Sequence, residues 1–408
     1  MSSVDMPQPG FSTSQALALA FVAFSSIPAG IPLIGLYWTP GLVLGLTLTA
    51  LLGIQILQGQ VIDALGHRAT GCLAATLLGI TVATLASPLD EVAMLPVLRL
   101  AIVLASSFYV AQSLATSQRG RAALAVAFIC HALLHITYQL LFNPRTFAET
   151  GRFPGDNMVA STLIYCLPLL AFAPIQSAGR LTILGTLVLV GFATYSRMFI
   201  GHVMATLALL GTILRRAGRI TLTQTAVTLF LGGLLVGALY LYIDTQISDG
   251  RATSNIERLA SLLSALDAFS LQPSTGLGWG GWAWRHKMEG ISRTLIFFVP
   301  GGDEGNLSLN PHNGIARMLC DAGLIGTIPF LLLIGQTVYQ AMRWKGDTHH
   351  MLYLQSSAAG LLIGLSLSDP LESPNFWLAL VTTLAVARAL HGERSEQAAS
   401  LLEKGLQT

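Results

Sequence analysis

Charged residues are scarce in this sequence. Only 10% of its 408 residues are charged, whereas 53% are hydrophobic, and the mean hydropathy is +0.64. A soluble globular protein carries roughly 25% charged residues, so this chain has too little charge to cover a surface that faces water. The shortage excludes a soluble enzyme and a disordered chain. The formal net charge of +2 carries no signature of nucleic-acid binding.

Cysteines are few, and several catalytic motifs are missing. Cys72, Cys130, Cys166 and Cys320 all fall in apolar segments without a CxxC pair, so neither a disulfide framework nor a zinc site is indicated. The first fifteen residues lack the basic stretch and cleavage site of a signal peptide. The sequence has no Walker loop, HExxH, GxSxG or DxD-type motif, so nucleotide-driven chemistry is not indicated.

Long apolar runs dominate the chain instead. A helix that crosses ~30 Å of hydrocarbon needs roughly 20 mostly apolar residues. Twelve segments approach this length, which predicts an all-α polytopic membrane protein with about 12 transmembrane helices. The predicted spans are roughly 14–34, 40–58, 69–87, 92–114, 121–142, 157–174, 179–195, 198–214, 221–243, 313–341, 350–368 and 374–390.

The Lys and Arg residues of the short connections predict the orientation. If the N-terminus is cytoplasmic, nine of these residues fall in inside connections and three in outside ones, so both termini are predicted to be cytoplasmic. The nine are Arg68, Arg119, Arg121, Arg180, Arg215, Arg216, Arg219, Arg343 and Lys345, and the three are Arg145, Arg152 and Arg197.

One connection is long, and the orientation places it outside, in the periplasm of a Gram-negative cell. Within it, Ser254-Asn255-Ile256-Glu257 has the form of a capping box, and apolar residues follow at helical spacing as far as Phe269. This pattern predicts an amphipathic helix on the membrane surface or against the other helices. The predicted parts of the chain are spans one to nine (1–243), the periplasmic loop (244–311), spans ten to twelve (312–390) and a cytoplasmic tail (391–408).

Three residues at the predicted outer face are candidates for chemistry. Arg197 and Arg258 carry guanidinium forks that match phosphate oxygens; the alternatives are a snorkelling interfacial residue for Arg197 and a solvated charge for Arg258. His312 lies where the loop re-enters the membrane, and the dipole of a helix start favours the neutral imidazole that a general base needs. Its alternative is a capping or packing role. Together the three suit a lipid-linked phosphate ester.

Other polar residues inside the predicted spans are weaker candidates. His131 and His135 share a helix face, but no third metal ligand accompanies them. Arg317 and Asp321, four residues apart, are predicted to neutralise each other. Arg99 is an intramembrane charge, by default a functional hypothesis, with no identifiable partner. Asp369 and Glu372 are predicted to lie outside, where their carboxylates would orient the cations of the site. Three tryptophans of the loop are predicted to anchor it at the membrane interface or to stack on sugars: Trp279, Trp282 and Trp284.

Several of these motifs occur together in a known family. Gly276-Leu277-Gly278-Trp279-Gly280, Pro311-His312-Asn313-Gly314 and Asp321-Ala322-Gly323-Leu324-Ile325-Gly326 resemble the signature of the O-antigen ligase and polymerase superfamily. Ser196-Arg197 resembles the SR motif of this superfamily, and Arg258 lies where members carry an arginine. The resemblance is best over residues 190–380.

The resemblance implies a metal-independent, inverting glycosyltransferase without a cofactor. The donor would be a glycan on undecaprenyl diphosphate, and the acceptor a sugar hydroxyl of lipid A–core, at the periplasmic face of the bacterial inner membrane. His312 would activate the acceptor hydroxyl, while Arg197 and Arg258 would bind the diphosphate.

Two alternatives to a ligase are considered. Polymerases of this superfamily often carry two large exterior loops, whereas this sequence has one, which favours the ligase. A transporter or flippase of anionic lipid-linked substrates belongs to a different class of protein, and its charges are expected near the bilayer midplane rather than at one face.

Overall fold

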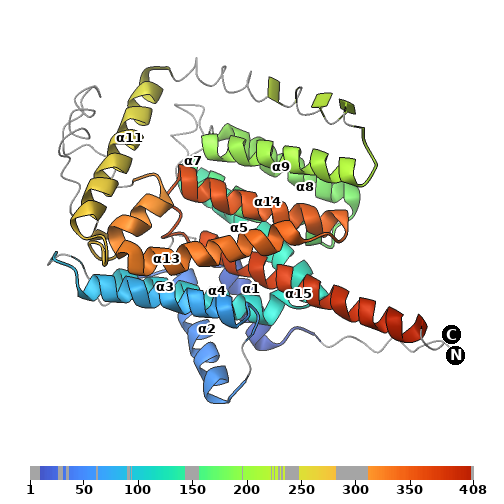
Figure 1. Cartoon of the computed structure of the whole chain (residues 1–408), viewed down its shortest axis with the longest axis horizontal. Helices are drawn as coiled ribbons and strands as arrows, with labels where there is room; N and C mark the ends of the chain where they lie inside the picture. The colour runs from blue at the N-terminus through green and yellow to red at the C-terminus, as the bar shows by residue number, and fades with distance from the viewer. Residues whose placement is uncertain are drawn as a thin grey trace.

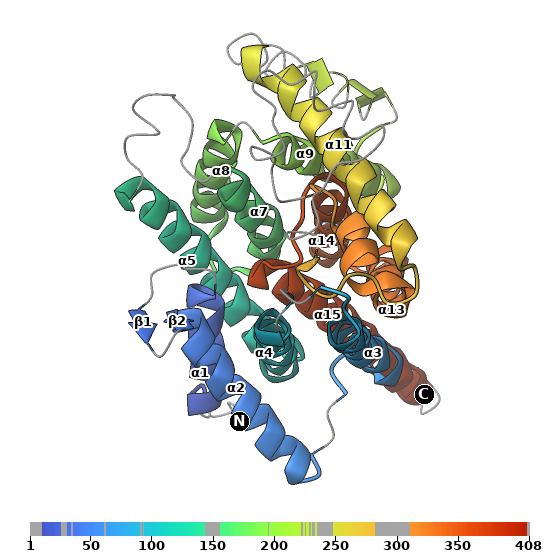
Figure 2. The same ribbon diagram turned by 90° about the vertical axis from the view of Figure 1, so that its left-hand side faces the viewer.

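The helices of this protein form one bundle in a computed structural model (Figures 1 and 2). The structure describes residues 10–25, 31–33, 36–60, 63–89, 92, 94–142, 156–194, 196–221, 248–281 and 311–405, with a few residues between 223 and 234. Its main helices are α1 (Thr13–Phe24), α2 (Pro40–Leu57), α3 (His67–Leu85), α4 (Met94–Val110), α5 (Gln118–Phe142), α7 (Asp156–Cys166), α8 (Ser177–Ala193), α9 (Arg197–Arg216), α11 (Ser248–Leu271), α13 (Gly314–Arg343), α14 (Thr348–Leu367) and α15 (Pro374–Gly405).

Short helices extend two of these elements. A π-helical turn, η1 (Ala111–Ala115), continues α4, and a 3₁₀ segment, η2 (Leu167–Phe172), continues α7. Seven helices of the described part are long and apolar enough to cross a membrane: α2, α3, α4 with η1, α5, α9, α13 and α14. Shorter apolar helices lie at α1, α7 with η2, and α8. The all-α polytopic membrane fold is thereby confirmed, while the total of twelve spans stays a prediction because most of 221–243 lies outside the described residues.

The first predicted span is wrong in its second half. The span was expected over 14–34, but α1 ends at Phe24, and β1 (Ile31–Leu33) pairs antiparallel with β2 (Leu36–Trp38). A proline inside a helix removes a backbone hydrogen bond and clashes with the preceding turn. Pro32, together with the neighbouring Gly30 in the sequence, therefore opposes a helix that continues to residue 34.

Small residues bring α3 and α13 close together. A Cβ atom on Gly79 of α3 would lie 2.6 Å from the carbonyl oxygen of Ile325 and 2.7 Å from the Cα of Gly326, both on α13. Without a hydrophobic driving force between helices in lipid, such close backbone approach supplies the packing. This contact fixes α13, the helix that His312 precedes.

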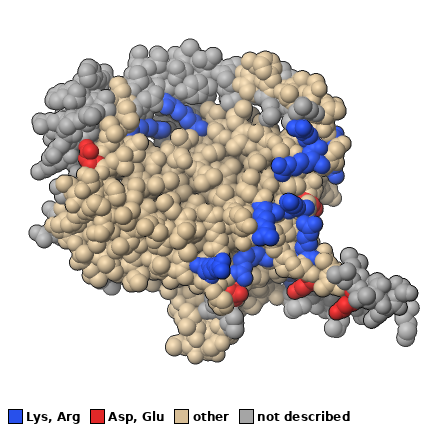
Figure 3. Space-filling model, viewed as in Figure 1, with Lys and Arg blue, Asp and Glu red and all other residues tan. Residues whose placement is uncertain are grey.

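The two ends of the bundle differ in charge. Figure 1 shows α11 on the left, with the starts of α13 and α9, while α15 ends on the right. In Figure 3 most Lys and Arg side chains gather on the right, and an uncharged surface covers the middle. This separation agrees with the predicted charge bias of the connections. Which end faces the cytoplasm stays a prediction, as do the domain boundaries.

Candidate functional site

α11 packs against the first half of α13 through small side chains. Ala265 and Ala268 of α11 form a buried cluster with Ala316 and Cys320 of α13. Because these side chains are short, the two backbones approach closely, and polar residues on the edge of α11 come within reach of the start of α13. Figure 2 shows α11 at the edge of the bundle, with its C-terminal half beside α13.

The predicted start of α11 is wrong, and its apolar stripe is buried only in part. The helix begins at Ser248, so Ser254 lies inside it and is not an N-cap. Leu259 and Leu266 are exposed, although the spacing of the apolar residues placed them on one stripe. Leu262 packs against the buried cluster beside the alanines, so one edge of the apolar stripe contacts α13, and the other faces away from the bundle, where a membrane surface would cover it.

His312 precedes α13 in an unusual backbone conformation. Its φ is +50°, a left-handed value that is uncommon outside glycine. The next residue, Asn313, is the N-cap: its side-chain oxygen accepts a hydrogen bond from the Ala316 N–H at 2.9 Å. The Asn313 side-chain amide also donates to the Ser366 carbonyl at 3.2 Å. These bonds fix the backbone on both sides of the turn and so set the position of the imidazole.

Arg258 is an electrostatic neighbour of His312. Burial, and to a smaller extent the positive charge of Arg258, together lower the pKa of His312 from 6.5 to about 4. The imidazole is therefore neutral at pH 7, as the sequence predicted. The cause is different, however, because burial and Arg258 account for the neutral form rather than the helix dipole.

Arg197 is the first residue of α9. It is half-buried, and the preceding Ser196 is the buried N-cap. The start of α9 lies at the same end of the bundle as α11 (Figure 1). The structure thus brings Arg258 and His312 into electrostatic contact and places Arg197 at the same end. That Arg197 joins them around one substrate stays a prediction.

The glycine-rich turn after α11 fills a break in α13. The break is at Gly323, whose φ of +56° and ψ of −161° are not helical. A break frees backbone groups that would be costly to leave unpaired in a membrane protein. Three hydrogen bonds between the turn and α13 satisfy such groups: Leu277 N–H to the Cys320 carbonyl at 2.8 Å, Leu324 N–H to the Pro273 carbonyl at 2.8 Å, and Ile325 N–H to the Ser274 carbonyl at 3.1 Å.

Two glycines allow this contact. Gly276 has a φ of +70°, and a Cβ on it would lie 2.6 Å from the Cys320 carbonyl oxygen. A Cβ on Gly323 would lie 2.4 Å from the Ser274 carbonyl oxygen. Both distances are far below van der Waals contact, and both conformations disfavour other residues. The two glycine motifs of the sequence are therefore the two halves of one interface.

The same turn contacts the end of α3. Trp279 donates its backbone N–H to the Thr84 hydroxyl at 3.0 Å, and Gly280 donates its own to the carboxylate of Asp321 at 3.0 Å. The turn therefore joins α3 and α13, and since it directly follows α11, it holds Arg258 beside His312.

We expect Gly323→Ala to destabilise the protein strongly. The added methyl group meets the Ser274 carbonyl, and a left-handed conformation costs an alanine ~1–2 kcal/mol before that clash is counted. A fall in Tm of the detergent-solubilised protein, with loss of activity, is the expected result. Gly335→Ala in the same helix is the matched control, because its Cβ meets nothing within 4 Å and alanine is favoured there. Equal Tm values for the two variants would contradict the role of the turn.

Arg317 of α13 binds three carboxylates. Its guanidinium contacts Asp321 at 3.0 Å and Glu372 at 2.5 Å, and it also pairs with Asp369. It lies 5.7 Å from the ring centre of Trp279. The pairing with Asp321 was predicted from spacing. Asp369 and Glu372 follow about fifty residues later in the sequence, and their predicted location outside the membrane was the reason to expect that they orient a cation. This cluster ties the segment between α14 and α15 to the outer half of α13.

The two histidines of α5 make hydrogen bonds rather than a metal site. His131 lies 3.1 Å from the carbonyl of Ala23, and His135 lies 3.3 Å from the hydroxyl of Thr162. Among the described residues, no group of three or more His, Cys, Asp or Glu is arranged to hold a metal ion. Trp282, Trp284 and the acidic residues of the later loop lie outside the described residues.

A family match covers the elements just described. Residues 181–331 match the model of the O-antigen ligase family. This segment of the chain is similar to the O-antigen ligases. The matched segment contains Arg197, Arg258 and His312, together with the glycine-rich turn and the break in α13. No curated protein matches the sequence.

The O-antigen ligase family, which this segment resembles, is one of glycosyltransferase-like enzymes that act on lipid-linked glycans in a membrane. This favours an enzyme over the transporter alternative. The family comprises ligases and polymerases, so the specific donor, acceptor and reaction belong to the proposal that follows.

Proposed function

We propose that the protein is an O-antigen ligase of lipopolysaccharide biosynthesis. It transfers a glycan from undecaprenyl diphosphate to a sugar hydroxyl of lipid A–core at the periplasmic face of the inner membrane. The supporting observation is the electrostatic interaction between Arg258 and His312, in which the guanidinium charge and burial lower the pKa of the imidazole and so favour its neutral form.

In this reaction the imidazole of His312 accepts the proton of the acceptor hydroxyl. The hydroxyl oxygen attacks the anomeric carbon, the bond from that carbon to the diphosphate oxygen breaks, and the electron pair leaves with the diphosphate. A single direct displacement of this kind inverts the anomeric configuration. The negative charge that develops on the leaving group is stabilised by Arg258 and Arg197, since preorganised cationic donors favour such charge.

The proposal includes a role for the donor in activating the base. Arg258 disfavours protonation of His312 in the free protein. When an anionic diphosphate binds to Arg258, its charge offsets that of the guanidinium, and the pKa of His312 rises. The imidazole therefore becomes a stronger base when the donor is present.

We expect purified protein to transfer glycan in excess EDTA. Arginine side chains supply the positive charge that a divalent ion provides in many glycosyltransferases. The experiment combines carrier-linked glycan with lipid A–core, and detects the product by its gel mobility and its anomeric configuration by NMR. Inhibition by EDTA that magnesium or manganese reverses would contradict the arginine mechanism.

The acceptor used distinguishes the ligase from the polymerase. A ligase needs lipid A–core and leaves the carrier-linked glycan unextended in its absence. Growth of the carrier-linked glycan without lipid A–core would instead identify a polymerase, with the same donor and another acceptor.

A further inference from the structure

Arg99 is an exposed cation near the start of α4, in the outer part of a helix that is apolar enough to span a membrane. In the part of the chain that the structure describes, no carboxylate forms an ion pair with it. The nearest acidic candidate, Glu372, shares its pockets but is bound by Arg317 at 2.5 Å. An arginine at this depth is costly unless an anion or water meets it.

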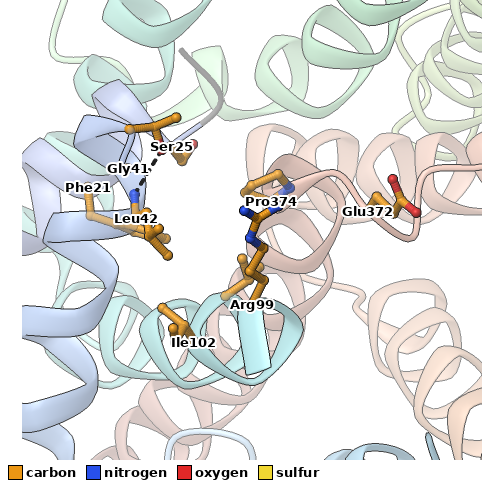
Figure 4. Close-up of a pocket in the computed structure, with 10 residues that line it drawn as sticks. Phe21, Ser25, Gly41, Leu42, Arg99, Ile102, Glu372 and Pro374 are labelled. Carbon is orange, nitrogen blue, oxygen red and sulfur yellow. Dashed lines mark hydrogen bonds between the residues drawn. The ribbon is translucent and has the colours of Figure 1, made fainter. Parts of the chain in front are cut away.

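Two pockets meet at Arg99. The first, of about 240 Å³, lies among α1, α2, α4 and the start of α15, and Figure 4 shows the Arg99 side chain reaching from α4 toward Pro374. The second, of about 260 Å³, lies between α4 and the segment that precedes α15. Apart from Arg99 and Glu372 the walls are mainly apolar, with Phe21, Leu42 and Ile102 in the first pocket and Leu100 and Leu371 in the second.

This combination suits the phosphate of a lipid. The fork of an arginine binds phosphate oxygens in a bidentate manner, and the apolar walls accept the hydrocarbon chain beside it. The Glu372 carboxylate is bound at 2.5 Å by Arg317, which it shares with Asp321 and Asp369, so Arg317 rather than Arg99 holds it.

The position of the pockets distinguishes them from the proposed donor site. Arg197 and Arg258 lie on α9 and α11, whereas Arg99 lies on α4, with α1 and α2 around its first pocket and Trp279 of the glycine-rich turn at its second. A reaction between two lipids needs a place for each. We propose that Arg99 binds a phosphate on the acceptor lipid and thereby places its sugars at the outer face; this inference rests on the proposed function.

Glu372 connects the two regions. It lines both pockets and binds Arg317, which lies in the first turns of α13, the helix that His312 precedes. A headgroup held at Arg99 therefore borders the cluster around Arg317, and its sugars extend from there toward the base.

Binding to the full chain in nanodiscs tests this inference without requiring transfer. The probes are a bisphosphorylated, acylated glucosamine disaccharide, its phosphate-free form, undecaprenyl phosphate and phosphatidylglycerol. We expect the bisphosphorylated lipid to bind about 10- to 100-fold more tightly than its phosphate-free form, as one charged hydrogen-bonded contact allows. Arg99→Ala should remove this preference, Arg99→Lys should retain part of it, and Arg68→Ala, an exposed arginine at the start of α3, should keep it.

Three results would overturn the inference. They are an unchanged preference in Arg99→Ala, binding of undecaprenyl phosphate that depends on Arg99, and equal Arg99-dependent binding of phosphatidylglycerol. Because Arg99 is exposed, its variants should elute from size exclusion like the wild type. If lipid binding depends on Arg99 as expected but no glycan is transferred, the result counts against the proposed function and not against the lipid site.

Discussion

Replacement of His312 by asparagine should abolish glycan transfer while the protein stays folded. A sugar hydroxyl is a weak nucleophile, and a positioned base contributes roughly 100- to 10,000-fold to such a reaction. Asparagine is chosen because it tolerates the φ of +50° at this position, so the backbone should keep its conformation. The measurement is the initial rate of transfer at saturating donor and acceptor, with Tm recorded for each variant.

His312→Ala should be equally inactive and less stable, since alanine is more strained in a left-handed conformation. His67→Ala provides the control, because it removes an exposed histidine from the start of another helix, α3. A transfer rate within a few-fold of the wild type in His312→Asn would exclude this residue as the base and leave it a packing role.

Loss of Arg258 should reduce the rate and also change its pH dependence. Removing one electrostatic donor to a transition state costs roughly 100- to 1,000-fold. In addition, Arg258 lowers the pKa of His312, which is about 4, so Arg258→Ala should raise that pKa while burial still holds it below its usual value. The base acts when it is neutral. The acid limb of kcat/KM, near pH 4 in the wild type, should therefore move to higher pH in Arg258→Ala.

Arg258→Lys separates the two effects. Lysine keeps the positive charge, so the acid limb should stay near pH 4, but it lacks the fork and should restore little of the rate. An acid limb at the same pH in the wild type and Arg258→Ala would show that the contact with His312 does not operate in the active protein. For Arg197→Ala we expect a similar loss of rate, because Arg197 is proposed to bind the same diphosphate as Arg258.

The helical membrane fold follows from composition because apolar runs of sufficient length have few other outcomes. The errors occur where local chemistry competes with hydropathy. The segment around Pro32 is apolar enough for a helix but forms a strand pair. In α11 the predicted apolar stripe is only partly buried: Leu262 packs against the contact with α13, Leu259 and Leu266 are exposed, and alanines fill the contact because close approach to α13 favours small side chains.

The candidate residues of the site were predictable from the sequence, but the contacts that position them were not. Topology places His312 and Arg258 at one face, and the structure brings them into electrostatic contact. No spacing in the sequence shows that Gly276 fits against the break at Gly323, since this depends on how two distant backbones meet. The carboxylates around Arg317 are similarly separated along the chain and come together only when α13, α14 and α15 have packed.

The turn that fills the break in α13 constrains how sequences of this kind can vary. Its main-chain hydrogen bonds to the main chain of α13 come from Pro273, Ser274 and Leu277, which lie in one short stretch. Side chains that point elsewhere are free to change, but an insertion or deletion of a single residue in this stretch would shift every following partner out of register. Length variation in the exterior loop is therefore expected to avoid residues 273–281, and a circular permutation or tag placed there should fail even where the added residues are small and polar.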